Sequence, residues 1–279
     1  MIDYIVRLAK RFAVLVPGIV IAYFSVHDIF PVVDKQVPVA FAIFITYVLG
    51  AYLLIPLAIR LARIFFPARH LPLYCVTPDG FASDPLNIAI IGSKRRLVRS
   101  MRAAGWHVAD QHTWRNIIRE VAAGILNQPY PTAPMSNLYL FGRKQDIGFE
   151  IPIEGERGHR HHVRFWATTY ENNGELTAKK IRWHERKERL QGSDLLWVGA
   201  ASRDVGFAII KHNVQVTHMI DPDTNRERDL IVKGLAESGL LSSTQDIRLG
   251  RAYRVSNRAL GGHLRSDGKL QVVRLIDKE

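Results

Sequence analysis

The chain has 279 residues, of which 47% are hydrophobic and 23% are charged, and its formal net charge is +12. This length allows one or two domains, and the mixed composition excludes collagen-like and intrinsically disordered classes. The single cysteine, Cys75, excludes an internal disulfide and a zinc site built from several thiolates. The positive charge favours an anionic partner, such as phospholipid head groups, a phosphorylated small molecule or nucleic acid.

Residues 1–68 are predicted to form a membrane anchor with two transmembrane helices. Residues 12–33 are largely apolar apart from His27 and Asp28, and residues 37–59 contain no Asp, Glu, Lys, Arg or His. Each run is long enough to cross a bilayer core at ~1.5 Å per residue. A cleavable signal peptide is the competing interpretation, but the first run is not followed by a small-residue cleavage pattern.

The basic residues around the two spans predict the orientation of this anchor. Those outside the hairpin are Arg7, Lys10, Arg11, Arg60, Arg63 and Arg69. The connecting loop offers only Lys35, so the positive-inside rule places both termini in the cytoplasm. His27 and Asp28 lie near the outer end of the first span, where we expect them to be solvated rather than to handle protons.

Residues 69–279 are predicted to form one cytoplasmic α+β domain. The elements expected first are a strand over 86–91, a helix over 94–104, a strand over 106–109, a helix over 113–126, and strands over 138–141, 147–153, 162–168 and 195–210. Ser93 is the expected N-cap of the first of these helices, and Gly105 its end. Cys75 is expected to be a small buried hydrophobic residue, and Arg143 with Asp146 to brace a turn.

The strand and helix pattern returns near the C-terminus. Asp221 is the expected N-cap of a helix with Pro222 at its first position, and strands over 253–255 and 270–276 follow. These units around a central meander predict an α+β fold, in which a two-helix transmembrane hairpin precedes a soluble, largely antiparallel sheet with helices on one face. The densely charged residues 171–190 are expected to form a solvated extension, with contact to anionic lipid as the alternative.

Several segments of the predicted domain resemble a known family. They read DPLNIAIIGS, AAGW, YPTAPMSNLYLFGRKQDIGFE, HHVRFW, LWVGAASRDVGF and VTHMIDPDTNRERD. In this order they resemble the LssY-type C-terminal domain of bacterial membrane proteins, over residues 74–258. The resemblance implies a bacterial inner-membrane setting, in which the two predicted spans would make the protein multi-pass. In that family the domain often accompanies a lipid phosphatase or a DedA-like membrane domain, neither of which is recognisable here, and the resemblance assigns no catalytic residue.

The segment HRHHVRFW, residues 159–166, contains the first candidate site. Alternation along a strand places His162, Arg164 and Trp166 on one face, and His161 on the opposite, core-facing side. Imidazole and guanidinium groups two residues apart can bind one phosphate group. The first face is therefore predicted to be presented to a ligand, whereas His159 and Arg160 are expected to be solvated.

His218 and Asp221 are the next candidates, because the strand that carries them could lie beside His162. The set His162, Arg164, His218 and Asp221 would suit a phosphoester hydrolase, and Asp204 could add an oxygen ligand for a metal. Asp221 has a structural alternative as a helix N-cap. The spacing matches no metal motif, so the sequence predicts neither a metal site nor a cofactor.

A second candidate site is the turn that precedes the helix over 94–104. Ser93, Lys94, Arg95 and Arg96 lie where free backbone amides and the helix dipole attract an anion, and Arg164 could contribute to anion binding as well. The alternative is an ordinary capped helix with solvated basic side chains.

The sequence contains no catalytic motif. We therefore expect a bacterial inner-membrane protein whose cytoplasmic domain binds an anionic ligand, either phospholipid head groups or a phosphorylated small molecule, in an accessory or regulatory role. A phosphoester hydrolase of envelope lipid metabolism is the alternative. The expected partners are the phospholipid membrane and an anionic ligand, with a membrane-protein partner left open; nucleic-acid binding would rest on charge alone.

Overall fold

The fold is given by a computed structural model of the whole chain. It describes residues 16, 19–54, 57, 71–78, 82–111, 113–126, 128, 130–153, 159–170, 176–182, 195–209, 216–257 and 262–276. The chain divides into two compact units. The first comprises Met1–Ala68 with Val76–Phe81, and the second comprises Arg69–Cys75 with Ala82–Glu279.

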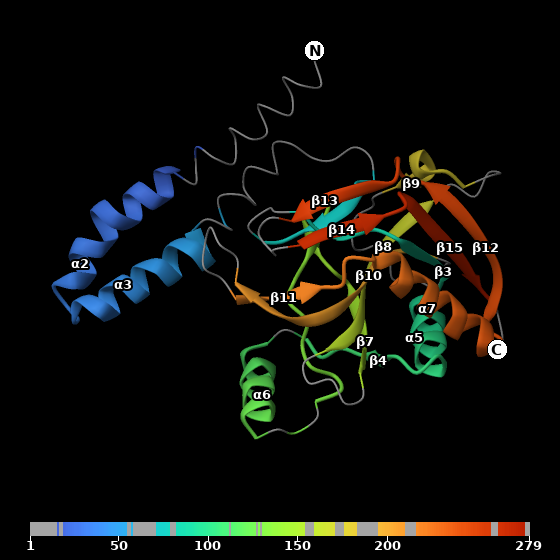
Figure 1. Cartoon of the computed structure of the whole chain (residues 1–279), viewed down its shortest axis with the longest axis horizontal. Helices are drawn as coiled ribbons and strands as arrows, with labels where there is room; N and C mark the ends of the chain where they lie inside the picture. The colour runs from blue at the N-terminus through green and yellow to red at the C-terminus, as the bar shows by residue number, and fades with distance from the viewer. Residues whose placement is uncertain are drawn as a thin grey trace, which may run out of the picture. The chain divides into compact units, whose positions relative to one another are not determined.

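The first unit is a helical hairpin (Figure 1). Its described elements are the π-helical turn η1 (Ser25–Ile29), α2 (Phe30–Asp34), α3 (Val39–Val48) and the π-helical turn η2 (Leu49–Leu54). Pro38 is the N-cap of α3, where its fixed φ of −51° suits the start of a helix. Among the residues that the structure describes, no helix is both long enough and apolar enough to cross a membrane. Residues 1–15 and 58–68 of the predicted anchor lie outside the described part.

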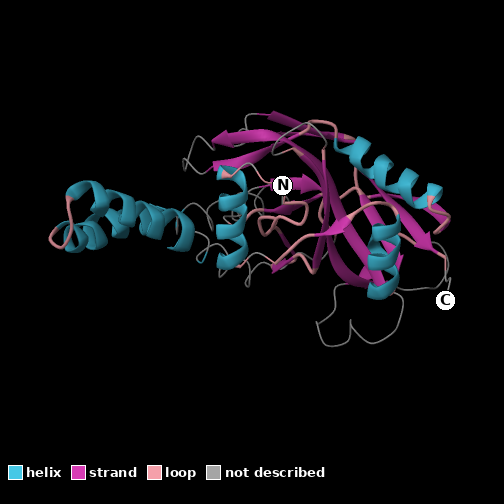
Figure 2. Ribbon diagram, turned by 90° about the horizontal axis from the view of Figure 1, so that it is seen from below, coloured by secondary structure: helices cyan, strands magenta, loops and turns pink. Residues whose placement is uncertain are grey.

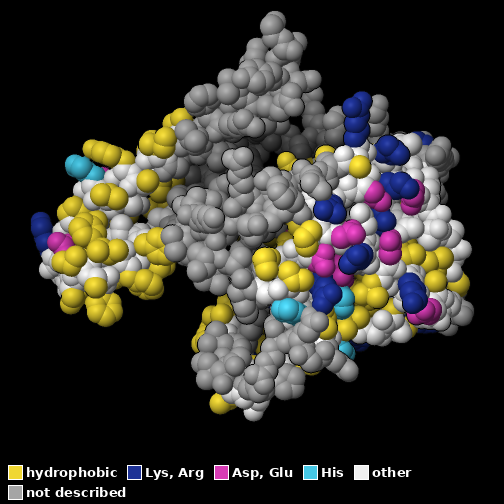
Figure 3. Space-filling view, in the orientation of Figure 1, with side chains coloured by type: hydrophobic (Ala, Val, Ile, Leu, Met, Phe, Trp, Pro, Cys, Tyr) yellow, Lys and Arg dark blue, Asp and Glu magenta, His cyan; other side chains and the backbone are white. Residues whose placement is uncertain are grey.

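Small side chains fill the inside of the hairpin, and large apolar side chains cover its outside. Ser25, Ala42 and Thr46 are buried, and a Cβ atom on Gly50 would lie 3.3 Å from Ser25 Oγ. Val26 and Phe41, in contrast, are 68% and 62% exposed. Figure 3 shows hydrophobic side chains spread over this hairpin. The distribution is the reverse of that in a water-soluble helical pair, whose large apolar residues face inward.

The second unit is built on a nine-stranded sheet. The strands of its main path, in the order in which they lie, are β12 (Leu241–Arg248), β15 (Lys269–Leu275), β3 (Ile88–Gly92), β10 (Leu195–Ile209), β8 (Arg160–Tyr170), β7 (Ile147–Pro152) and β4 (His107–Val108). Two more strands, β11 (Val216–Ile220) and β9 (Ile181–Arg182), pair with β10 and β8. The described β15 and β3 pair in parallel, and the other pairings of this sheet are antiparallel.

Two smaller sheets accompany the large one. The first contains β2 (Ala82–Pro85), β1 (Tyr74–Val76), β5 (Tyr139–Leu140) and β6 (Arg143–Lys144), and the second contains β13 (Tyr253–Asn257) and β14 (Gly262–Ser266). Strands β5 and β6 are joined by Phe141 and Gly142, with φ values of 52° and 83°. Positive φ at both central residues is the conformation of the two-residue turn that matches the twist of a hairpin.

The three helices predicted for the soluble domain are present. They are α5 (Lys94–Ala103), α6 (Trp114–Ile125) and α7 (Thr224–Glu237). Ser93 caps α5 as predicted, but the N-cap of α7 is Asp223 rather than Asp221, and Pro222 precedes the helix. The prediction failed by two residues because Asp221 and Asp223 are equally good caps, and Asp221 Oδ1 instead accepts a hydrogen bond from the Asp223 amide.

Two layers of buried side chains enclose the large sheet. On one face, Leu97 and Met101 of α5 and Ile231 and Leu235 of α7 pack with strand residues such as Phe165. Figures 1 and 2 show these two helices side by side against the strands. The α+β class with a mostly antiparallel sheet is thus confirmed.

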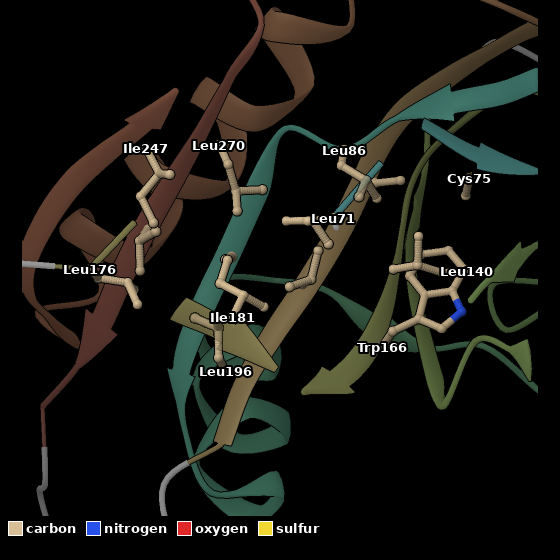
Figure 4. Packing of buried hydrophobic residues seen from close by; sticks show 14 of the residues in the cluster. Leu71, Cys75, Leu86, Leu140, Trp166, Leu176, Ile181, Leu196, Ile247 and Leu270 are labelled. Atoms are coloured by element: carbon tan, nitrogen blue, oxygen red, sulfur yellow. The ribbon is translucent and has the colours of Figure 1, made fainter. Parts of the chain in front are cut away.

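The opposite face of the sheet is covered as well. Cys75 of β1 and Leu140 of β5 pack there with Trp166 and Leu196. Figure 4 shows this cluster, from Cys75 and Trp166 at one side to Leu176 and Ile247 at the other. The large sheet is therefore buried on both sides. A strand side chain that points away from α5 and α7 still points into the interior of the second unit.

The charged segment 171–190 differs in part from the prediction. Residues 171–175 and 183–190 lie outside the described part. Between them a short 3₁₀ turn, η3 (Ala178–Lys180), leads into β9, and Leu176 and Ile181 are buried in the core. The expectation of a solvated extension is wrong for Leu176 and Ile181. A short segment can bury single side chains without showing the hydrophobic periodicity by which buried elements are recognised in a sequence.

Candidate functional site

The polar face of β8 is buried in the second unit. Arg160, His162 and Arg164 lie on one face of the strand, and β10 contributes Ser202 and Asp204, which pair with His162 and Arg160. His162 and Arg164 are only 3% and 5% exposed. The prediction that they are presented to a ligand is therefore wrong. The alternation was predicted correctly, but the smaller sheet of β1, β2 and β5 covers this face.

Asp84 of β2 lies at the centre of this buried face. Its Oδ2 accepts hydrogen bonds from Arg164 Nη1 at 2.9 Å and from Ser202 Oγ at 3.0 Å, and its Oδ1 accepts from Ser83 Oγ at 3.1 Å. Burial alone would raise the pKa of Asp84. The hydrogen bond from His162, the positive charge of Arg164 and the Ser202 hydroxyl outweigh burial and lower the pKa from 3.8 to about 2. Asp84 is therefore an ionised carboxylate inside the protein.

His162 links Asp84 to a second carboxylate. Its Nε2 lies 2.9 Å from Ser202 Oγ and 3.5 Å from Asp84 Oδ2, and its Nδ1 lies 3.4 Å from Asp204 Oδ1. The carboxylate of Asp204 accepts a hydrogen bond from Arg160 Nε at 3.1 Å. Acidic and basic side chains thus alternate along the buried face.

Arg160 ends this network and reaches Glu150 of β7, with Nη1 2.8 Å from Glu150 Oε2. The expectation that Arg160 is solvated is wrong, since its side chain is only 13% exposed and pairs with two carboxylates. The network joins three carboxylates to two guanidinium groups and one imidazole, contributed by Asp84, Glu150, Asp204, Arg160, Arg164 and His162. Since a buried charge without a partner is costly, the charged side chains of β2, β7, β8 and β10 are buried together with their partners.

Ser202, His162 and Asp204 stand in the hydroxyl, imidazole and carboxylate order of serine hydrolases. Ser202, however, has no exposed surface, and its hydroxyl donates a hydrogen bond to Asp84. A substrate has no access to the hydroxyl in this conformation. The three residues belong to a buried polar network in which His162 Nδ1 makes no hydrogen bond to a described residue, and the network would need to open before it could catalyse a reaction.

The other two predicted catalytic candidates do not join the network in the described contacts. Strand β11 pairs with the far end of β10, so that the backbone of His218 lies opposite Phe207; the His218 side chain lies outside what the structure describes. The Asp221 amide donates to the Arg203 carbonyl, and the Asp221 carboxylate closes the turn before α7. Among the described residues, no three or more His, Cys, Asp and Glu side chains are grouped to hold a metal ion.

The second candidate site lies on α5, where the residues divide into an anchored side and a basic side. Ser93 Oγ accepts a hydrogen bond from the Arg96 amide at 3.3 Å, so the hydroxyl serves as the N-cap. Leu97 and Met101 are fully buried, whereas the basic side chains of Lys94, Arg95, Arg99 and Arg102 are exposed. Arg95, Arg99 and Arg102 follow each other at spacings of four and three residues, and therefore form one stripe along the helix. We call these four residues the α5 basic face.

The α5 basic face differs from its neighbour α7 in how its charges are paired. Within the described residues, none of its four cations has a salt bridge. On α7, Arg226 pairs with Asp223 at 3.5 Å and Lys233 with Glu237 at 3.7 Å. The sequence prediction stopped at Arg96 and missed Arg99 and Arg102, although the helical spacing from Arg95 could have identified them.

Arg164 is not part of this basic face. Its neighbour on the same side of β8, Trp166, packs in the cluster away from α5, so the sheet separates Arg164 from the helix. Its guanidinium charge is already offset by Asp84. The predicted anion-binding residues therefore lie in two separate places. Ser93, Lys94, Arg95 and Arg96 are at the start of α5, whereas Arg164 belongs to the ionic network.

The comparisons with known proteins identify the family. A model of the family described as LssY C-terminus matches residues 68–270. No curated protein and no solved structure matches the chain. The match covers both the residues of the ionic network and the α5 basic face. Because it also extends over well more than half of the chain, the protein belongs to the LssY C-terminus family.

Proposed function

We propose that this protein is anchored in a bacterial inner membrane and that its α+β domain binds anionic phospholipid head groups through the α5 basic face. The observation that carries the proposal is the exposure of Lys94, Arg95, Arg99 and Arg102 with no acidic partner in the described part of the chain. Unpaired cations along a helix lower the free energy of binding to a negative surface. The role would be accessory or regulatory.

The extended shape of the α5 basic face favours binding to a membrane surface over binding of a single small phosphate compound. Arg95 and Arg102 are seven positions apart, about 10 Å along a helix. One phosphate group is bound by donors that converge, whereas a row of head groups can meet a row of cations. At about 1 kcal/mol for each basic residue near an anionic membrane, four residues would contribute roughly 4 kcal/mol.

The first unit supports a membrane location. Its exposed side chains, such as Tyr23, Phe41 and Phe44, are large and apolar, while small residues make the contact between its helices. Helices in a lipid environment pack in this way because lipid tails accept large apolar side chains, and small residues allow close approach. We propose that this hairpin is embedded in the bilayer as a two-span anchor, with both termini in the cytoplasm.

The experiment is an arginine footprint of the full chain in vesicles of two compositions. Phenylglyoxal modification is followed by mass spectrometry in phosphatidylcholine vesicles and in equal parts of phosphatidylcholine and phosphatidylglycerol. Anionic lipid should slow the modification of Arg95, Arg99 and Arg102 by about fivefold each, as expected for ~1 kcal/mol per residue. Arg226, which is on α7 and 76% exposed on its side chain, is the internal control and should change little.

Two matched variants sharpen this test. Arg99→Gln/Arg102→Gln removes two positive charges from α5, and Arg226→Gln/Lys233→Gln removes the same charge from α7. Only the first should abolish the protection of Arg95, and added salt should abolish it in the unchanged protein. Equal footprints in the two vesicle compositions would contradict the proposed function.

A phosphoester hydrolase of envelope lipid metabolism is the second candidate function. The Ser202 to His162 distance of 2.9 Å, with Asp204 behind the imidazole, supports it. The test is the rate at which the full chain hydrolyses a panel of generic phosphoesters. Under this hypothesis, Ser202→Ala and His162→Ala would both abolish hydrolysis, and a rate unchanged by both substitutions would exclude it.

A further inference from the structure

Helix α6 exposes apolar side chains that the fold does not use. Trp114, Ile118 and Leu126, at the start, the middle and just after the end of α6, are 67%, 59% and 65% exposed. Among the other described residues of the second unit, the most exposed large apolar side chains are those of Met219 and Leu230, at 38%. Trp114 and Ile118 are four positions apart and so lie on one side of the helix. We call Trp114 and Ile118 the α6 apolar face; Leu126, twelve positions after Trp114, lies about 120° further around the helix axis and is not part of it.

The helix is held firmly at its base. Thr113 Oγ1 accepts a hydrogen bond from the Asn116 amide at 3.3 Å and caps the first turn. The chain that enters and the chain that leaves the helix are joined at Asp110, whose Oδ2 accepts hydrogen bonds from Tyr130 Oη at 2.6 Å and Thr132 Oγ1 at 3.2 Å. The apolar face is thus presented by a braced element, which Figures 1 and 2 show apart from α5 and α7.

Cations lie directly beside the apolar face. The guanidinium carbon of Arg115 lies 5.4 Å from the centre of the Trp114 ring, and that of Arg119 lies 4.6 Å from the centre of the Tyr130 ring. Aliphatic side chains, aromatic rings and arginines on one short helix are typical of helices that lie in the interface of an anionic bilayer. A twofold contact between two copies through this face would instead bring Arg115 and Arg119 of both copies together, which like-charge repulsion disfavours.

We propose that α6 inserts Trp114 and Ile118 into the head-group region of an anionic bilayer. The domain would then contact the membrane at two places, through charge on α5 and through apolar side chains on α6. This inference rests on the proposed function, because it assumes that the domain meets a phospholipid surface. The two contacts use different residues and different physical forces, so they can be tested separately.

The test uses tryptophan fluorescence of the full chain in vesicles of equal parts of phosphatidylcholine and phosphatidylglycerol, with and without brominated lipids. Trp106, Trp166 and Trp197 are at most 2% exposed, and Trp183, which lies outside the described residues, is replaced in Trp183→Phe. The difference between Trp183→Phe and Trp183→Phe/Trp114→Phe then isolates the signal of Trp114. Brominated lipid should quench this signal, and acrylamide in the water should quench it less than in the unfolded chain.

A tryptophan moved to α7 provides the matched control. The variant Trp114→Phe/Trp183→Phe/Leu230→Trp carries its exposed tryptophan on a helix with paired charges, and brominated lipid should leave it unquenched. Ile118→Asp in the Trp183→Phe background should abolish the quenching of Trp114, because a carboxylate beside it opposes insertion. Absence of quenching in the Trp183→Phe protein, or equal quenching of the α7 control, would overturn the proposal.

The outcomes separate this inference from the proposed function. If lipid protects the arginines of α5 but brominated lipid does not quench Trp114, α6 insertion fails and head-group binding stands. If Trp114 is quenched while the α5 footprint is unchanged by anionic lipid, α6 insertion stands and the role of α5 fails. Acrylamide protection that rises with protein concentration, with no quenching by brominated lipid, would identify a contact between proteins and overturn insertion.

Discussion

Arg164 Nη1 donates a hydrogen bond to Asp84 Oδ2 across 2.9 Å, and this contact joins β8 to β2 through the interior of the second unit. Both side chains are almost completely buried. The pair connects the large sheet to the smaller one, beside the apolar cluster that also packs between the two layers.

Removing one member of the pair should be more damaging than removing both. Arg164→Met leaves Asp84 as a buried carboxylate with a lost partner and should lower the free energy of unfolding by about 3–5 kcal/mol. Arg164→Met/Asp84→Leu removes both charges and should be more stable than Arg164→Met. Urea unfolding of the detergent-solubilised chain, followed by tryptophan fluorescence, measures both values.

The surface pair of Lys269 and Asp246 is the control for this comparison. Lys269 Nζ lies 2.8 Å from Asp246 Oδ2, but both side chains are 40% exposed or more. Lys269→Met should therefore change the free energy of unfolding by less than about 1 kcal/mol. If Lys269→Met were as destabilising as Arg164→Met, burial would not be what makes the Arg164 pair important.

Asp84 should make the stability of the domain depend on pH at the acidic end. Its pKa is about 2 in the folded protein against 3.8 ordinarily, so the carboxylate stabilises the fold fully above pH 3.8. This contribution is lost as the pH falls through the window from 3.8 to about 2, since protons then bind the unfolded chain more tightly than the folded one. A pKa difference of this size corresponds to about 2 kcal/mol.

The measurement is the midpoint of urea unfolding between neutral pH and the acid limit of solubility. Asp84→Asn should be less stable at neutral pH and should show a flatter dependence in that window. Asp246→Asn, which alters an exposed carboxylate, should retain the slope of the unchanged protein. A slope that Asp84→Asn leaves intact would show that other carboxylates cause the acid dependence.

Cys75 should be an unreactive thiol in the folded protein. Burial, and next to it the negative charge of Asp84, raise the pKa of Cys75 well above its usual value, and its Sγ donates a hydrogen bond to the Asp84 carbonyl at 3.2 Å. A thiol reacts as its thiolate, so alkylation at pH 8 should be slow in the folded chain and fast in urea. Because Cys75 is the only cysteine, mass spectrometry of the alkylated chain reports directly on opening of the domain.

Gly199 should not tolerate a side chain. A Cβ atom there would lie 2.5 Å from Phe165 Cε1 and 2.9 Å from Ile88 Cγ2, in the middle of the sheet. Gly199→Ala should lower the free energy of unfolding by about 1–3 kcal/mol or more, because neighbouring core side chains must leave their positions.

Gly234 in α7 is the matched position for the same substitution. There, a Cβ atom would lie 3.4 Å from the Cβ atom of Ala104, an ordinary contact, and alanine favours a helix by about 1 kcal/mol over glycine. Gly234→Ala should therefore be neutral or stabilising. Equal destabilisation of the two variants would show that the tight contact at Gly199 is not the cause.

Local pattern was sufficient for those parts of the fold that depend on neighbouring residues. The cap and end of α5 were predicted because Ser93 and Gly105 act within one turn of their own helix. The alternation of β8 was predicted because strand periodicity is a local property. The brace between Arg143 and Asp146 was predicted for the same reason, and Arg143 Nη1 does donate to Asp146 Oδ1 at 2.9 Å.

The roles of His162 and Arg164 depended on residues far away in the chain. Asp84 lies 80 positions from Arg164, and Ser202 lies 40 positions from His162. No local pattern indicates that β2 covers this face of β8, and so a strand face with two basic residues was taken for a ligand site. The same limit applies to Arg160. Because it lies near a glycine in the sequence, its side chain was expected to be solvated.

The sequence by itself therefore determined the three helices of the second unit, most of its strands, the basic character of α5, and the family. Only the tertiary structure decided which of these faces are covered. Burial of a side chain depends on what the rest of the chain places over it, and that contact is non-local. For this reason the ionic network around Asp84 became part of the interior, while the α5 basic face and the α6 apolar face remained on the surface.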